Sequence, residues 1–134
     1  MTELKWYKVS GIHFENNVQN GTQLKLKNAV KYNVNYFGEE KRCAGKLDFT
    51  VSDEQMQPFE IRIQMEAVFT YDEGDNRADI HVDSFAQLFP FLRQVISGVT
   101  SMSGMPALMI PFMRLNRDSV NINNAGEEES SPLN

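Results

Sequence analysis

The first seventy residues alternate between apolar and polar side chains with a period of two, which is typical of strands with one buried face. The clearest run is 24–37, where the even positions are mostly aliphatic or aromatic and the odd positions are mostly lysine or asparagine. Two later runs, 45–51 and 59–66, alternate in the same way. Short polar turns separate the runs. Neighbouring strands are therefore predicted to be antiparallel, because a parallel crossover needs about a dozen residues or more.

The first run of the chain is less regular than the others. Leu4 and Ile12 share one parity, whereas Tyr7 and Val9 share the other. A bulge or bend near residues 8–11 would bring these apolar side chains onto one face. With that irregularity, the sequence predicts four long antiparallel strands.

After the fourth run the period changes to three and four. From Phe85 to Met102 the apolar residues form one broad helical stripe, which predicts a long helix. Asp83 or Ser84 is expected to cap its start. Pro90 breaks a hydrogen bond inside a helix but is tolerated in its first turn, so the regular helix is expected to begin only around Phe89.

The segment after the helix, residues 105–113, is apolar but contains two prolines, so we expect it to lie extended against an apolar surface. Methionines cluster around it, and methionine suits surfaces that must fit many partners. The alternative is that these residues fill the gap between helix and sheet. Residues 121–134 have too few apolar side chains to offset the entropy of ordering and are predicted to be a disordered acidic tail. The predicted organisation is one α+β domain, 1–120, followed by the tail 121–134.

Composition excludes several classes of protein. The net charge is −5, divided as +3 over residues 1–50 and −8 over residues 51–134. The chain therefore lacks the concentrated basic surface of a nucleic-acid-binding protein. It contains no apolar run long enough for membrane insertion and no N-terminal secretion signal, so we expect a cytoplasmic protein. The lone Cys43 agrees with that location.

Catalytic and metal-binding patterns are not evident in the sequence. His13 and His81 are far apart, and neither forms a recognisable relay with Cys43. The acidic stretch 72–79 lacks the spacing of a calcium loop, and no glycine-rich phosphate loop occurs. We therefore expect a protein that is not an enzyme and has no cofactor or metal.

Two stretches resemble the SecB family of protein-export chaperones. Residues 88–93 (LFPFLR), followed by Ile96, Ser97 and residues 105–110 (MPALMI), resemble that family's helix and apolar loop, where a Leu-Phe-Pro-Tyr-Ala-Arg run leads to a Phe-Pro-x-Leu-x-Leu segment. Residues 12–16 (IHFEN) resemble the end of its first strand, Ile-Ser-Phe-Glu. The resemblance covers roughly residues 4–115.

The resemblance implies an α+β subunit, with a four-stranded antiparallel sheet packed on one long helix, that assembles as a dimer of dimers and binds unfolded polypeptides without ATP. Client segments are expected to contact residues of the proline-broken loop and nearby aromatic residues, namely Tyr32, Tyr36, Phe37, Phe91, Met105, Met109 and Phe112. The homo-oligomer is expected to form through residues of the helix, namely Val95, Ile96, Val99 and Met102.

Two features depart from the family. SecB chains have a second long helix after the apolar loop, whereas here only residues 113–122 precede the tail. SecB docks the translocation motor SecA through acidic residues on the sheet. Glu15 matches one such acid, but Arg62 stands where another acid is usual.

The sequence thus predicts a SecB-like holdase for unfolded or pre-export polypeptides, with SecA as a possible partner. Two alternatives remain open. One is a dedicated chaperone of a single partner, such as the antitoxin of a toxin–antitoxin pair. The other is a small domain that binds an apolar ligand.

Overall fold

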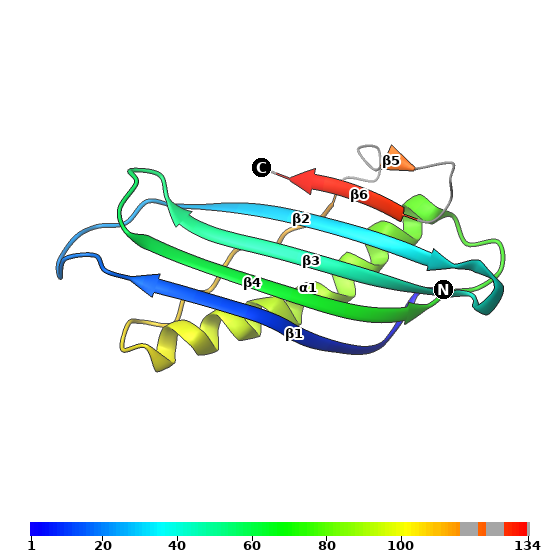
Figure 1. Cartoon of the computed structure of the whole chain (residues 1–134), viewed down its shortest axis with the longest axis horizontal. Coiled ribbons are helices and arrows are strands. Elements are labelled where there is room, and N and C mark those ends of the chain that lie inside the picture. The colour runs from blue at the N-terminus through cyan, green and yellow to red at the C-terminus, as the bar shows by residue number, and fades with distance from the viewer. Residues whose placement is uncertain (116–120, 123–127, 134) are drawn as a thin grey trace.

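The computed structural model describes residues 1–115, 121–122 and 128–133 and shows one antiparallel sheet with a long helix on one face (Figure 1). This confirms the predicted α+β class. The elements are β1 (Glu3–Asn16), β2 (Leu26–Phe37), a short 3-10 helix η1 (Gly38–Glu40), β3 (Arg42–Asp53), β4 (Phe59–Thr70), α1 (Arg77–Met102), β5 (Asn121–Ile122) and β6 (Glu128–Leu133).

Within the described residues the strand order is β1-β4-β3-β2-β6-β5, and every neighbouring pair is antiparallel. The four predicted strands form the body of the sheet, with β1 at one side. The pairing of β1 with β4 shifts register between Leu4 and Trp6 and again between Val9 and Gly11. The second shift confirms the irregularity predicted near residues 8–11, and it lets residues of both parities face α1.

The tail was predicted to be disordered over residues 121–134. Of this range, residues 123–127 and 134 lie outside the described part of the chain. The others form β5 and β6, and β6 lies beside β2 on the side of the sheet opposite β1 (Figure 1).

Alternating side chains of the strands form the core beneath α1. Tyr32 is fully buried there, and its hydroxyl is 2.6 Å from the Ser84 hydroxyl of α1. Burial raises the pKa of Tyr32, so its phenol stays neutral. Its ring lies over Gly45 of β3, where a β-carbon would come within 3.0 Å of three Tyr32 atoms. Gly45 thus makes room for the Tyr32 ring, which joins β2 to the helix.

The helix begins earlier than predicted. Its first residue is Arg77, and the side chain of Asn76 caps it by accepting a hydrogen bond from the Ala78 N–H at 2.8 Å. The predicted starts at Asp83, Ser84 or Phe89 are wrong. Ile80 and His81 of the first turns are buried in the core. The sequence pattern did not reveal this buried face, because His81 is polar and lies among acidic residues.

Pro90 lies inside α1, which continues through it to Met102. The proline ring removes the N–H that would bond to the Ala86 carbonyl. Its side chain is exposed, and the neighbouring Phe89 is fully buried. The packing of the apolar stripe therefore holds the helix together across the missing bond.

The helix crosses the sheet obliquely, from β2 toward β1 (Figure 1). Tyr36 near the end of β2 donates a hydrogen bond to the Arg77 carbonyl at 3.2 Å. Further along, Phe91 stacks on Tyr7 of β1, with ring centroids 4.6 Å apart. One flank of α1 therefore borders β1, while its first turns lie over β2.

A side chain of α1 also fastens the start of β1. The Gln87 amide accepts a hydrogen bond from the Leu4 N–H at 2.8 Å and donates one to the Thr2 carbonyl at 2.7 Å. These are the two bonds that a neighbouring strand would make. Gln87 therefore takes the place of a peptide unit beside the first residues of the chain.

The close approach of Tyr32 to Gly45 generates a prediction. Gly45→Ala should lower the free energy of unfolding by about 1–3 kcal/mol, because the added methyl group overlaps a ring that is held by Ser84. Urea denaturation measures the change. Gly98→Ala is the matched control, since a β-carbon there meets nothing within 4 Å and a helical Gly→Ala change is expected to stabilise by about 0.5–1 kcal/mol. Equal stability of the two variants would contradict this account of the core.

Candidate functional site

The segment 105–115 runs back along α1 and is tied to it at two points. The Leu108 N–H donates a hydrogen bond to the Thr100 hydroxyl oxygen at 2.8 Å. The Arg93 Nε donates to the Ile110 carbonyl oxygen at 2.9 Å. We call this pair of bonds the Arg93–Thr100 clamp. The clamp fixes to α1 an extended segment that is not itself part of a helix or strand.

The clamp divides the segment into buried and exposed side chains. Ile110 and Leu115 are buried in the core. By contrast, 62% of Met109 and 58% of Phe112 is exposed to solvent. Phe112 also meets the buried ring of Phe89 edge-on, with centroids 6.1 Å apart. Two large apolar side chains are thus held in solvent by a segment whose other side is anchored.

Met109 and Phe112 each border a hollow against α1. The hollow at Met109 has a volume of about 440 Å³, and the one at Phe112 has about 180 Å³. The first is lined by Pro90, Arg93, Gln94, Ser97, Gly98 and Met109, and the second by Val82, Asp83, Ala86, Phe112, Arg114 and Leu115. We call Met109, Phe112 and these two hollows the loop surface.

One carboxylate borders the loop surface. Burial raises the pKa of Asp83, and the nearby acids Asp79 and Asp75 raise it further. The Asp83 side chain is nevertheless exposed to solvent, so it places a polar group at the border of the hollow that Phe112 and Leu115 line.

The other residues predicted to contact clients lie elsewhere. Tyr32 and Tyr36 are core residues with at most 6% of their surface exposed, so they are not available to a client in this structure. Their even-numbered positions share the buried face of β2, which the alternation itself indicated. Phe37 is exposed at the end of β2, and the guanidinium carbon of Arg42 lies 5.8 Å from the centroid of its ring. Met105 is half-buried at the start of the segment.

Phe91 lies on the other flank of α1 from the loop surface. It follows Phe89 by two residues, which is about 200° around the helix axis. It stacks on Tyr7 of β1 instead of approaching Phe112. The structure therefore brings together Met109 and Phe112 and separates Phe91 and Phe37 from them.

Three of the four predicted interface residues, Val95, Val99 and Met102, lie on the same side of α1 as Phe91. Val95 and Val99 are half-buried, 82% of Met102 is exposed, and Ile96 is fully buried against the sheet. Sequence reasoning missed the contribution of β1. Its Tyr7 and Ile12 pair with residues of the buried face of β4 and so face the helix side, yet both are exposed. The resulting surface, which we call the β1 flank, consists of Tyr7, Ile12, Phe91, Val95, Val99 and Met102.

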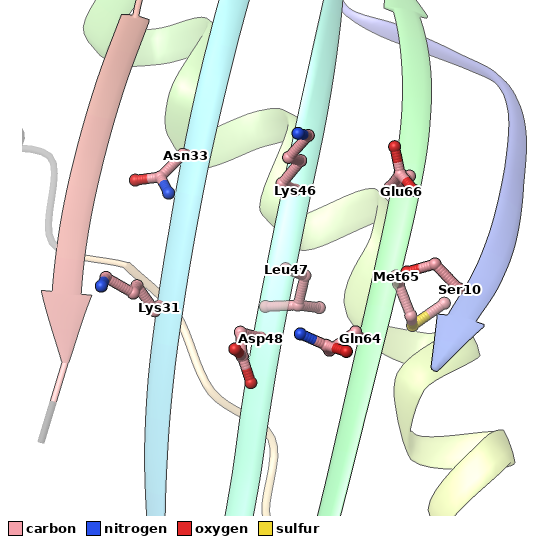
Figure 2. A pocket seen from close by; sticks show the side chains of 9 residues that line it. All are labelled: Ser10, Lys31, Asn33, Lys46, Leu47, Asp48, Gln64, Met65 and Glu66. Carbon is pink, nitrogen blue, oxygen red and sulfur yellow. The ribbon is translucent and has the colours of Figure 1, made fainter. Parts of the chain in front are cut away.

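The face of the sheet away from α1 is polar and carries both charges. Figure 2 shows the lysine, aspartate, glutamine and glutamate side chains of β2, β3 and β4 that line a hollow there, and the volume of this hollow is about 310 Å³. Arg62 donates two hydrogen bonds to the Asp48 carboxylate, at 3.0 and 2.6 Å. These bonds hold the pKa of Asp48 below its usual value.

The two residues predicted to dock a partner share this polar face. Glu15 of β1 lies opposite Glu60 of β4, and the Nε2 of His13 is 3.9 Å from a carboxylate oxygen of each. Arg62 is next along β4, opposite His13. The acids of this region therefore lie beside cationic or titratable partners and do not form a purely acidic surface.

The two histidines do not share a site. His81 is buried under the edge of the Tyr32 ring, whereas His13 is exposed on the opposite face of the sheet. Within the described ranges no cluster of His, Cys, Asp or Glu has the arrangement of a metal site. The described part of the chain also has no helix long and apolar enough to cross a membrane.

Comparison with known proteins supports the fold. No family model and no curated protein sequence matches the chain. Among solved structures, the Mycobacterium tuberculosis SecB-like chaperone Rv1957, in complex with a ChAD peptide from the Rv1956 HigA1 antitoxin, has a similar structure, with a TM-score of 0.66. The two share 12% sequence identity over 84% of this chain and 87% of that one. The fold is therefore SecB-like.

The Arg93–Thr100 clamp can be tested directly. Arg93→Ala combined with Thr100→Val should speed hydrogen–deuterium exchange in a peptide covering residues 105–115, because both bonds to the segment are removed. Gln94→Ala is the control, since Gln94 is exposed beside Arg93 and makes neither bond. If the segment exchanged equally fast in both proteins, contacts other than the clamp would hold it.

Proposed function

We propose that this chain is an ATP-independent chaperone that binds extended, apolar segments of other polypeptides at the loop surface. The observation that carries the proposal is the exposure of Met109 and Phe112 on a clamped segment. A segment that served only as core filling would turn its largest apolar side chains inward. The SecB-like fold of the chain is consistent with this function.

The loop surface suits loose recognition of many sequences. Methionine is flexible and polarizable, and the Phe112 ring offers a flat apolar face. Burying each of these side chains under a client contributes about 1.5–3 kcal/mol. Two such contacts alone fall short of the roughly 8 kcal/mol of a micromolar complex, so backbone hydrogen bonds or a second subunit must contribute the rest.

The β1 flank supports the proposal that the protein is a homo-oligomer. Its six residues lie on β1 and α1, which meet where Phe91 stacks on Tyr7, and each of them remains at least partly exposed. A second copy placed on this flank would remove it from water, and exposed apolar surfaces of this kind usually mark interaction sites. A dimer of dimers would present several loop surfaces to one client and so increase its affinity.

A dedicated chaperone of a single partner is the second candidate. The solved SecB-like neighbour holds a peptide from an antitoxin, which supports this version of the proposal at least as well as the general one. The polar sheet face, where Arg62 neutralises Asp48, gives less support to delivery to SecA than an acidic surface would. Both versions use the same loop surface and differ in the range of clients.

Charged substitutions test the loop surface. Met109→Asp and Phe112→Asp should each abolish suppression of aggregation of a chemically unfolded model protein, because a carboxylate in an apolar contact costs several kcal/mol. Circular dichroism should show an intact fold, since both side chains are largely exposed. Met56→Asp, at an exposed methionine in the β3–β4 turn, is the matched control and should remain active. Full activity of the double variant would place the client site elsewhere.

Oligomerisation can be measured by light scattering at micromolar concentration. The wild-type chain should have a mass well above its 15.3 kDa monomer, and Phe91→Asp should shift it toward the monomer by charging the β1 flank. The Met56→Asp variant should keep the wild-type mass. A wild-type mass of 15 kDa at every concentration would contradict the proposed assembly.

Docking to SecA is tested by a charge reversal on the polar sheet face. Arg62→Glu should strengthen retention of the chain on immobilised SecA if this face docks the motor, because it adds an acid and frees Asp48. Arg42→Glu makes the same change of charge on β3, near the end of the sheet. Equal effects of the two changes would show that net charge, and not this site, determines the binding.

A further inference from the structure

The outer edge of β2 is occupied by the chain's own C-terminal segment. Residues Val30–Asn35 pair in antiparallel register with β6, from Leu133 opposite Val30 to Glu128 opposite Asn35. Figure 1 shows β6 beside β2, far from the other edge of the sheet. Without β6, the backbone N–H and C=O groups along this side of β2 would be open to another strand.

The sequence of β6 is a poor one for a permanent strand. It reads EESSPL, with two glutamates, two serines and a proline, all residue types with low or moderate preference for strands. Proline also lacks the N–H that a strand donates and is tolerated only at edges. Main-chain hydrogen bonds are therefore the principal attraction of β6 to β2. Any extended polypeptide can supply the same bonds.

Charge does not account for this pairing. The register places Glu128 and Glu129 opposite Asn35 and Val34, whereas Lys31 lies opposite Pro132. The segment is tethered to the same chain, however, which raises its effective concentration at the edge.

The β2 edge lies close to the loop surface. The first turns of α1 pack over β2 through the hydrogen bond between Ser84 and Tyr32. Phe112 lies against the same part of the helix, in the hollow with Val82 and Ala86. A strand added at this edge would therefore run near the exposed Phe112 side chain. Sites that bind extended peptides combine an open strand edge with apolar contacts of this kind.

We propose that the edge of β2 is a strand-docking site that Glu128–Leu133 occupies in the free protein and that an extended client segment takes by displacing it. The proposal rests on the proposed function and adds its regulation. The tail acts as an internal competitor. The apparent affinity for a client is therefore the affinity of the open edge multiplied by the fraction of molecules whose edge is open. If one molecule in ten is open, removing the competitor raises the apparent affinity about tenfold.

Three proteins test the proposal: the full chain, a chain ending at Gly126, and the full chain with Ser130→Pro. The proline removes a backbone N–H within the paired segment and leaves its length and charge unchanged. Ser130→Ala is the matched control, because it keeps the N–H. Binding of fluorescein-labelled, reduced and carboxymethylated α-lactalbumin is measured by anisotropy. Hydrogen–deuterium exchange of a peptide spanning Val30–Asn35 is measured without the client.

The truncated chain and Ser130→Pro should bind the probe about tenfold more tightly than the full chain, and their β2 peptide should exchange faster. Ser130→Ala should match the full chain in both measurements. Adding a synthetic peptide of residues 127–134 should weaken binding of the probe to the truncated chain.

Several results would overturn the proposal. Unchanged exchange would show that the segment does not occupy the edge, and faster exchange with unchanged affinity would show that clients bind elsewhere. Weaker binding by the truncated chain would make the segment part of the client site. Protection of β2 that grows with protein concentration would assign the edge to the tail of a second copy. If no chain bound the probe, the proposed function would fail, and the exchange data would still decide whether the segment occupies the edge.

Discussion

One helix cannot cover a four-stranded sheet along its whole length when it crosses the strands obliquely, and this constraint shapes the rest of the molecule. The first turns of α1 lie over β2, where Ser84 meets Tyr32, and its later turns lie beside β1, where Phe91 meets Tyr7. The segment after the helix must therefore return along it to complete the apolar layer. That return brings Ile110 and Leu115 into the core and leaves Met109 and Phe112 outside.

The oblique course also gives the molecule two unlike apolar surfaces. The β1 flank is formed by side chains of a regular strand and a regular helix, and a second copy of the same rigid shape is the occupant proposed for it. The loop surface is formed by an extended segment with two hydrogen-bonded anchors and two hollows against α1. It suits an extended chain of variable sequence. The proposed assembly and the proposed client binding therefore use different side chains.

The sequence predicted the strands and the long helix because alternation and helical periodicity reflect which side of each element is buried. It misplaced the start of α1, since the buried His81 interrupts the apolar pattern and the capping residue Asn76 lies in a polar turn. Parity put Tyr32 and Tyr36 on the buried face of β2, yet the sequence interpretation assigned them to client binding, and the structure shows that both are core residues. The separation of Phe91 from Phe112 depends on the angle of the helix to the sheet, which no local pattern encodes. The pairing of β6 with β2 is likewise set by a backbone edge that its composition does not reveal.

The Gln87 amide beside Leu4 and Thr2 makes the two sides of the sheet unequal as templates for growth. A side chain that imitates one peptide unit satisfies the backbone there but offers no further donor or acceptor in line, so it terminates the hydrogen-bonded ladder at the start of β1. The β2 side has no such terminator, because β6 is itself a strand, and β5 pairs along its far side. Addition of a further strand is thereby opposed at the start of β1 by a covalently fixed group, and on the opposite side of the sheet it is opposed only by the short length of the last two strands.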